Sequence, residues 1–191
     1  SAMKKILPFF LIIFFSSISV RFYAQNCVSD YIWFSMQSEV DNFQQNYPGC
    51  THILGDVKIS GNNITNLAGL SVLTGIDGDL EIYNTLNLMS LQGLDNITFV
   101  GGDLIINGNY EITNLTGLQN LVTVEGGVYI IYNHVLTSIS ELSGLDDGSV
   151  SELSIHHNSM LMDCSVAGIC NYLQSPNGHV DIYYNASGCN N

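Results

Sequence analysis

Basic residues are scarce in this chain. It holds 4 lysine and arginine residues against 17 aspartate and glutamate residues, and only 11% of its 191 residues are charged. Proteins that bind DNA, RNA or anionic membranes neutralise phosphate groups with lysine and arginine. The composition therefore argues against nucleic acid and anionic membrane surfaces as partners, and it leaves cations and neutral polar ligands.

The basic residues are concentrated at the start of the chain, where two lysines precede an apolar run, Ile6–Phe15. The segment Met3–Val20 has the pattern of a secretory signal peptide, and its apolar run is short for a membrane span, which needs about 20 residues. We expect cleavage near Ala24 or Gln25, so that residues 1–25 are a tag remnant plus the signal peptide. An uncleaved N-terminal anchor is the alternative.

Cleavage would leave Lys58 as the one basic side chain against 17 acidic ones, a net charge of −16. We expect this chain to be secreted or held at the cell surface, with no membrane insertion after cleavage. A polysaccharide lyase needs a strong base or a cation to steady an acidic sugar, and arginine is absent from the cleaved chain. No G-x-S-x-G sequence and no convincing Cys-His arrangement is present either.

Cysteine is confined to the two ends of the cleaved chain. The five cysteines are Cys27, Cys50, Cys164, Cys170 and Cys189, and export makes disulfides chemically possible. We predict a disulfide between Cys27 and Cys50. Of the other three, one is left over or paired between chains. We predict no zinc site, because their spacing lacks a nearby histidine pair.

Residues 26–50 are predicted to form an N-terminal helical cap. Phe34, Val40 and Phe43, with Trp33 and Met36, fall roughly on one helical stripe. The end of a solenoid exposes an unpaired edge and core side chains, so that a cap is needed for solubility.

Residues 51–163 contain a repeat, and one further strand follows it. Steps of 23, 24, 25, 24 and 27 residues separate six short segments in which apolar residues alternate with others. Such alternation predicts β-strands with one buried face. The predicted inward pairs are Val57 and Ile59, Leu80 and Ile82, Leu104 and Ile106, Tyr129 and Ile131, Leu153 and Ile155, and Val180 and Ile182.

Each predicted coil turns at two corners. At the first, an inward asparagine can bond the backbone of its own turn and of the next coil. At the second, glycine permits a positive φ. The first corner holds Asn62, Asn109, Asn158 or Asn185, with Thr85 and His134 in two coils, and the second holds Gly69, Gly93, Gly117 and Gly144. Further inward residues follow at three-residue spacing, namely Leu88, Leu91, Leu94, Ile97 and Val100, matched by Ile112, Leu115, Leu118, Leu121 and Val124.

Residues 164–191 depart from the repeat. The segment Cys164–Leu173 predicts a short helix, which accounts for the longest repeat step. The last strand, Val180–Tyr184, and a cysteine-bearing cap follow.

Coils such as Leu153-Ser-Ile-His-His-Asn158, with G-D-L strand starts and G-L turns, resemble bacterial leucine-rich repeat proteins of the receptor L-domain type. The resemblance covers roughly Thr51 to Asn185. It implies a mainly β fold, a right-handed solenoid of parallel strands with about six coils. It also implies a secreted or surface-exposed protein that binds other molecules, and it transfers no catalytic residue.

Outward residues at one repeat position form columns, since stacked strands lie about 4.8 Å apart. One column is Lys58, Glu81, Ile105, Ile130, Ser154 and Asp181, and the other is Ser60, Tyr83, Asn107, Tyr132, His156 and Tyr183. Tyrosine and histidine offer rigid surfaces with a polar tip, as at binding hot spots. β-Propensity alone also favours such residues on strands. The candidate ligand-binding residues are Tyr83, Ile105, Asn107, Ile130, Tyr132, His156 and Tyr183.

Two metal hypotheses arise from the columns, and we predict neither a metal nor a cofactor. His134, His156 and His157 lie on neighbouring coils near Asp181, but exposed strand histidines explain them as well. Asp56, Asp79 and Asp103, with Glu152 on a later coil, would form a ladder that Ca²⁺ could bridge. An aspartate beside glycine more simply bonds backbone amides.

The sequence therefore predicts a non-enzymatic extracellular or cell-surface module that binds protein or carbohydrate through the outward face of its sheet. A structural spacer without a ligand is the alternative. A carbohydrate-active enzyme comes third, because glycoside hydrolysis needs two carboxyl groups roughly 5 to 9.5 Å apart. In the outward columns Glu81 and Asp181 are four coils apart, about 19 Å by the strand spacing.

Overall fold

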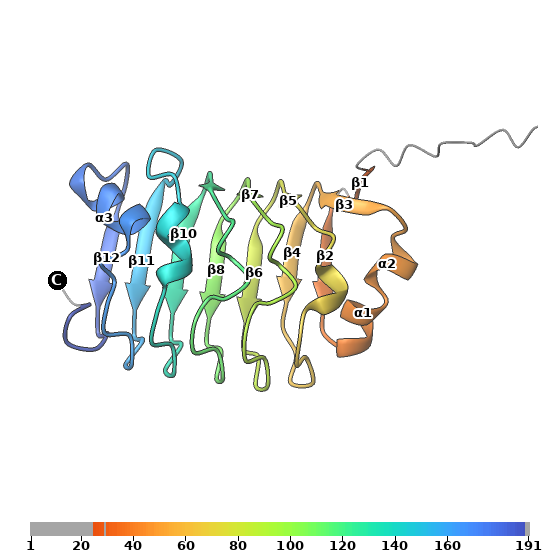
Figure 1. Ribbon diagram of the computed structural model, residues 1–191, viewed down its shortest axis with the longest axis horizontal. Coiled ribbons are helices and arrows are strands. Elements are labelled where there is room, and N and C mark those ends of the chain that lie inside the picture. The colour runs from red at the N-terminus through yellow and green to blue at the C-terminus, as the bar shows by residue number, and fades with distance from the viewer. Residues whose placement is uncertain (1–24, 29, 190–191) are drawn as a thin grey trace, which may run out of the picture.

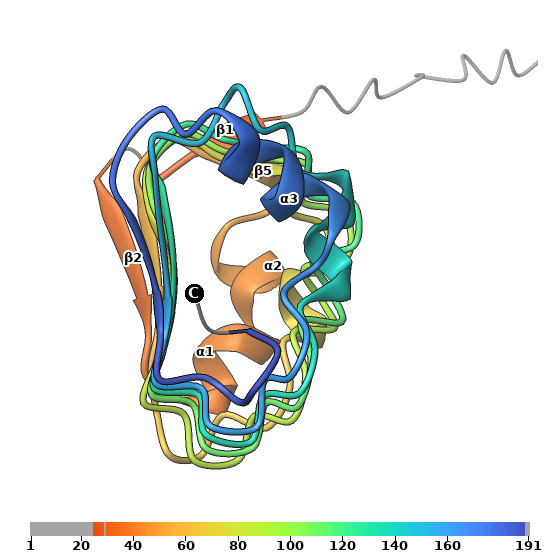
Figure 2. The same ribbon diagram turned by 90° about the vertical axis from the view of Figure 1, so that its left-hand side faces the viewer.

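The computed structural model describes residues 25–28 and 30–189, so the predicted signal segment lies outside the described residues. The chain is mainly β. Its strands form two parallel sheets that lie on adjoining sides of one core (Figures 1 and 2). The larger sheet has seven strands, which are β2 (Tyr31–Phe34), β4 (Asp56–Ile59), β6 (Leu80–Tyr83), β8 (Leu104–Asn107), β10 (Gly127–Ile131), β11 (Glu152–His156) and β12 (Val180–Tyr183).

The smaller sheet has five strands, which are β1 (Gln25–Cys27), β3 (Cys50–Ile53), β5 (Gly75–Ile76), β7 (Phe99–Val100) and β9 (Thr123–Val124). Successive strands of the larger sheet are separated in sequence by segments that lie on the other sides of the stack. The chain therefore winds once around the core in every coil, and Figure 2 shows the coils superposed around a common interior. Two coils contain a short 3-10 helix where the other coils have a loop, namely η1 (Ala68–Leu70) and η2 (Ser140–Gly144).

The predicted inward residues fill the interior. The three-residue series from Leu88 to Val100 and from Ile112 to Val124 are all buried, as are the strand pairs in β4, β6, β8 and β11. The interior is close-packed and consists mainly of a continuous stack of leucine, isoleucine and valine.

Strand β10 differs from the prediction by one residue. Its partners in β8 are Val128 opposite Leu104 and Ile130 opposite Ile106, so Val128 and Ile130 point inward. Tyr129 and Ile131 were the predicted inward pair, and they point outward instead. A one-residue change of register exchanges the two faces of a strand.

Buried amide side chains close the first corner of the coils. The backbone N–H groups of Thr85, Asn109, Asn133 and Asn158 each donate to the side-chain oxygen of the asparagine one coil later, at 2.9 to 3.2 Å. Each asparagine also donates from Nδ2 to an isoleucine carbonyl of the preceding coil, at 2.8 to 2.9 Å. We call Asn109, Asn133, Asn158 and Asn185 the asparagine ladder.

Two corner residues were predicted wrongly. Asn133, and not His134, occupies the corner after β10, in agreement with the shifted register, and His134 is exposed. Asn62 is exposed too, so the buried column begins at Thr85.

The glycine corner is conformationally mixed. Gly93 and Gly117 have φ of 112° and 118°, and a side chain there would collide with the backbone of the preceding coil at Leu67 and Leu91. These two positions therefore require glycine. Gly69 and Gly144 were expected to share this conformation, but they lie in η1 and η2 and do not have positive φ.

The N-terminal end of the stack is a strand followed by two short helices, where we predicted one helix. Strand β2 adds to the large sheet beside β4. Helices α1 (Gln37–Asp41) and α2 (Phe43–Asn46) then lie across the end of the stack (Figures 1 and 2). Phe34, Val40 and Phe43 are buried as predicted, whereas Trp33 and Met36 are about half exposed.

Disulfides tie both ends of the described chain. The predicted Cys27–Cys50 bond is present and joins β1 to β3. Cys164 pairs with Cys189, and Cys170 is a free thiol on helix α3 (Ala167–Gln174), which buries Ile169 and Tyr172.

Replacing Asn133 with alanine should lower the free energy of unfolding by about 2–4 kcal/mol, because it leaves the Asn109 N–H and the Ile106 carbonyl buried without their partner. Urea denaturation measures this change. The matched control is Asn62→Ala, at the equivalent but exposed corner, where we expect a change within about 0.5 kcal/mol. Equal losses in the two variants would show that the ladder adds nothing.

Peptide mapping of the protein under non-reducing conditions should recover Cys27 linked to Cys50 and Cys164 linked to Cys189. Cys170 alone should react with an alkylating reagent after unfolding without reductant. Recovery of a peptide that links Cys170 to either neighbouring cysteine would contradict the assignment.

Candidate functional site

The outward face of the seven-stranded sheet carries the predicted binding residues. Strand pairing aligns Tyr83, Asn107, Ile131, His156 and Tyr183 in one column along this face. Ile105 lies in the neighbouring column, between Glu81 and Tyr129. The columns follow directly from the register, since residues two apart on a strand share a face.

Two of the predicted residues are placed differently. Ile130 is fully buried and cannot contact a ligand, because the register of β10 puts it inside. Tyr132 is on the outward side but lies in the turn that follows β10, and Ile131 takes its place in the column.

Tyr129 occupies the outward place in the Ile105 column, and its surroundings are acidic. Burial, a hydrogen bond with Glu152 and the nearby charges of Asp103 and Asp79 together raise the pKa of Tyr129 to about 12. The phenol therefore remains protonated at physiological pH and acts as a hydrogen-bond donor.

Rings gather at the C-terminal half of this face. We call Tyr132, His134, His156, His157, Tyr183 and Tyr184 the Tyr–His cluster. Tyr132 stacks on His157 with centroids 4.5 Å apart, and His156 stacks on Tyr183 at 4.6 Å. Tyr184 contacts both His157, at 4.8 Å, and Tyr183, at 5.3 Å. The cluster joins three consecutive coils into one ring-covered surface.

The backbone at the cluster is unusual. Tyr132, His157 and Tyr184 have φ of 57°, 58° and 52°, in the left-handed region that bulky side chains avoid. In two earlier coils the corresponding turn positions hold Asn84 and Gly108, with φ of 51° and 66°. Asparagine and glycine are the residues that adopt this conformation readily. The last three coils therefore carry large rings at a position where small or amide residues fit better.

The two adjacent histidines bond to each other. The Nδ1 atoms of His156 and His157 are 2.9 Å apart, so one Nδ1 carries a hydrogen and donates it, and the other Nδ1 accepts. The pKa of His156 lies below its ordinary value, first because of burial and then because of His157, while Asp181 opposes the shift. The neutral form of this histidine is thus favoured in the folded protein.

The acidic ladder serves the backbone. Asp56, Asp79 and Asp103 each accept from a backbone N–H of the next coil through Oδ1, at 2.7 to 2.9 Å. Burial, followed by the charges of its neighbours, raises the pKa of Asp79 despite the hydrogen bond from the Asp103 amide. Glu152 lies one coil further along, where it pairs in register with Gly127. Within residues 25–28 and 30–189, no three or more His, Cys, Asp or Glu residues are grouped to hold a metal ion.

A groove lies at the N-terminal half of the same face. Its lining residues are Tyr31, Trp33, Asp56, Lys58, Glu81 and Tyr83, and its volume is about 450 Å³. We call it the Trp33 groove. Lys58 bonds Glu81, with Nζ 3.0 Å from Oε2, and lies 4.6 Å from the centre of the Tyr83 ring.

Sequence reasoning missed Tyr31 and Trp33, because Trp33 was assigned to an inward helical stripe. The signal was present, since Ile32 and Phe34 alternate with them as Val57 and Ile59 do one repeat step later. Strand pairing now places Tyr31 beside Asp56 and Trp33 beside Lys58.

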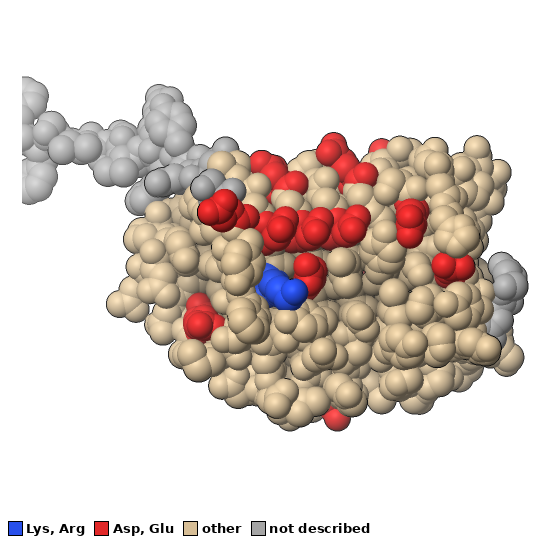
Figure 3. All heavy atoms as spheres, turned by 180° about the vertical axis from the view of Figure 1, so that it is seen from behind, with Lys and Arg blue, Asp and Glu red and all other residues tan. Residues whose placement is uncertain are grey.

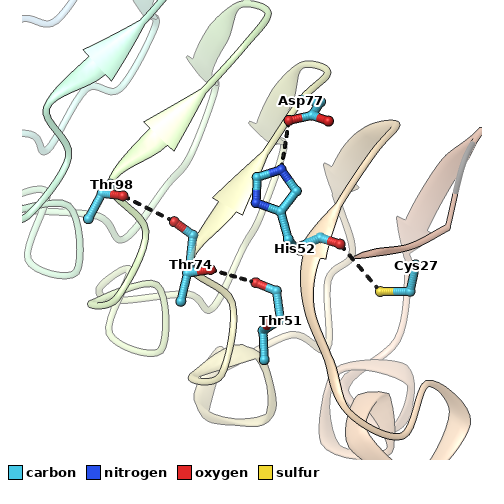
Figure 4. Close-up of polar contacts among 6 residues, drawn as sticks. All are labelled: Cys27, Thr51, His52, Thr74, Asp77 and Thr98. Atoms are coloured by element: carbon cyan, nitrogen blue, oxygen red, sulfur yellow. Dashed lines mark hydrogen bonds and ion pairs between the residues drawn. The ribbon is translucent and has the colours of Figure 1, made fainter. Parts of the chain in front are cut away.

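The smaller sheet carries a separate polar group (Figure 4). His52 Nε2 lies 2.6 Å from Asp77 Oδ1, and the His52 ring stacks on Phe99 at 6.5 Å. Nearby, Thr74 donates to the carbonyl of Thr51 at 2.9 Å, and Thr98 donates to that of Thr74 at 3.3 Å. These hydroxyls donate to carbonyls of the preceding coil, as the asparagine side chains do, so the two threonines hold adjacent coils together.

The family model of the receptor L domain matches residues 49–171 of this sequence. The chain belongs to the receptor L domain family. Members of this family are ligand-binding modules of receptors, and the family is not an enzyme family. A comparison with curated proteins found no match to this sequence.

Two observations indicate on which side of the membrane the domain is found. Two disulfides and the receptor L domain indicate an extracellular domain. In the part of the chain that the structure describes, no helix is both long enough and apolar enough to cross a membrane.

Acidification from pH 7 to pH 5 should destabilise the protein partly through His156. Its folded pKa is below the ordinary value of 6.5, so the unfolded chain takes up the proton first as the pH falls. His156→Phe keeps a ring against Tyr183 and removes this contribution. Between pH 7 and pH 5 the free energy of unfolding, measured by urea denaturation, should therefore fall less in the variant than in the parent. Above pH 7 it should change equally in the two proteins. Curves that stay parallel down to pH 5 would refute the assignment.

Proposed function

We propose that this protein is an extracellular or cell-surface binding module, non-enzymatic and exported through its N-terminal signal segment. It is built as a right-handed solenoid whose ends are capped. It recognises a protein or carbohydrate ligand through the outward face of the seven-stranded sheet. Tyr132, His156 and Tyr183 of the Tyr–His cluster supply most of the contact energy, and Tyr83, Ile105 and Asn107 extend the contact toward the N-terminus.

The observation that carries this proposal is the backbone at Tyr132, His157 and Tyr184. A left-handed conformation costs an ordinary residue about 1–2 kcal/mol, a cost that glycine avoids. Strained backbone of this kind is concentrated at functional sites. A spacer would gain from asparagine or glycine there, as at Asn84 and Gly108. A binding surface gains from rigid rings whose positions are fixed by stacking.

The distribution of charge supports the same face. Figure 3 shows acidic side chains in a row along one side of this face, with the basic side chain next to the row and a mostly uncharged area beyond it. In a chain of such high negative charge, an uncharged ring-covered area that stays exposed is suited to contact with another molecule. Tyr132 is 45% exposed and Tyr184 is 70% exposed.

Tyr132→Gly tests the proposal because it removes the ring and the backbone strain together. We expect at least tenfold weaker binding to a ligand identified on glycan and surface-protein arrays, consistent with a hot-spot loss of about 2 kcal/mol. The free energy of unfolding should change by less than about 1 kcal/mol, because relief of strain offsets the lost stacking. Tyr183→Ala should weaken binding comparably.

Tyr110→Ala is the control, because Tyr110 is 56% exposed but lies outside the cluster. Its affinity should equal that of the parent. If Tyr132→Gly and Tyr183→Ala both bind as the parent does, the cluster is not the recognition surface and the proposal is wrong.

A further inference from the structure

The Trp33 groove and the Tyr–His cluster occupy different halves of one face. Strands β2, β4 and β6 each supply two residues to the groove, whereas the cluster lies on the last three coils. The groove volume of about 450 Å³ lies in the range of small-ligand pockets. The groove is therefore a second candidate binding site on this face.

Two large rings in the groove are turned toward solvent. Tyr31 is 55% exposed and Trp33 is 49% exposed, although their strand neighbours Ile32 and Phe34 are buried. Tyrosine and tryptophan are enriched where proteins contact other molecules, and here the two rings are adjacent and line one groove. The rings are held by the parallel pairing of β2 with β4, so the groove is largely pre-formed.

The centre of the groove is an ion pair. Lys58 is bound to Glu81 and lies over the ring of Tyr83, and the hydrogen bond with Glu81 is the first cause that raises the pKa of Lys58. The pair is partly exposed, so it presents N–H donors and carboxylate acceptors side by side. Asp56 adds a further carboxylate at the edge, while its Oδ1 accepts from the Asp79 amide.

The charged groups of the groove disfavour three classes of ligand. An anion would be repelled by Asp56, Glu81 and the neighbouring aspartates. A cation would compete with the Lys58 ammonium, which already occupies the Tyr83 face and the Glu81 carboxylate. A purely apolar ligand would cover the ion pair without replacing its water, which is costly.

A neutral polyhydroxylated ring satisfies every group. Its C–H face can stack on Trp33 or Tyr31, and its hydroxyls both donate to carboxylates and accept from the ammonium. We propose that the Trp33 groove binds a neutral oligosaccharide, with Trp33 as the stacking platform and the Lys58–Glu81 pair as the hydroxyl-binding group. This deepens the proposed function by naming a ligand class at a second place on the same face.

Trp33 is the single tryptophan of the chain, so its fluorescence reports directly on the groove. The purified protein is titrated with neutral oligosaccharides of glucose, xylose, mannose and N-acetylglucosamine, up to millimolar concentrations. Parallel titrations use oligogalacturonate as the anionic probe and choline and oligolysine as cationic probes. We expect a saturable change in Trp33 emission with at least one neutral sugar and none with the charged probes.

The variants are measured by calorimetry, because two of them, Trp33→Ala and Trp33→Phe, lack the fluorophore. Trp33→Ala and Lys58→Met should each weaken binding of that sugar at least tenfold, and Trp33→Phe should retain an intermediate affinity. Unchanged melting curves verify folding. Tyr110 lies outside both the groove and the Tyr–His cluster, and Tyr110→Ala should bind the sugar as the parent does, so that a loss at Trp33 or Lys58 is specific to the groove.

Three results would overturn the inference. One is that no neutral sugar alters Trp33 emission. The second is that only a charged probe does so. The third is that a sugar binds with equal affinity to the parent, Trp33→Ala and Lys58→Met, in which case it occupies another place. None of these results bears on ligand binding at Tyr132 and Tyr183, which is tested independently.

Discussion

The asparagine ladder fixes the register of the coils from β6 to β12, which form most of the molecule. Each buried amide bonds two backbone groups of the preceding coil, so neighbouring coils cannot slide relative to one another without breaking both bonds. Fixed coils place equivalent side chains one strand spacing apart. The hydrophobic stack, the acidic ladder, the Tyr–His cluster and the Trp33 groove are all columns in this lattice. The inward side chains of the strands thus stabilise the fold, and the outward side chains form the candidate binding surfaces. The same strand spacing sets the position of both.

The inward half of the fold could be predicted from the sequence because its physical requirement is repetitive. Every coil must bury apolar residues at the same places, so Leu88, Leu91 and Leu94 have counterparts 24 residues on. The register of β10 could not be settled by alternation alone, since Val128 with Ile130 and Tyr129 with Ile131 both alternate correctly. The decisive signal was polar. Asn133 stands five residues after Val128, as Asn109 stands five after Leu104.

The site was harder to predict than the scaffold, because outward residues need not repeat. Tyr83, Asn107, His156 and Tyr183 were placed correctly by register alone. Ile130 was wrongly predicted to point outward, because the predicted register of β10 was shifted by one residue. Tyr31 and Trp33 were missed because a short amphipathic segment fits a helix and a strand about equally well. The left-handed turn conformations at Tyr132 and His157 could not be predicted from the residue types, because tyrosine and histidine do not favour positive φ.

The isolation of Lys58 also bears on how the folded chain meets proteases. From residue 25 onward it is the only lysine or arginine, and it lies in β4, paired with β2 on one side and β6 on the other. A trypsin-like enzyme must draw an extended segment of its substrate into its active site, and here that requires opening the sheet on both sides. The next residue, Ile59, is fully buried, so the one bond from residue 25 onward that such an enzyme can cut is held inside the stack of coils.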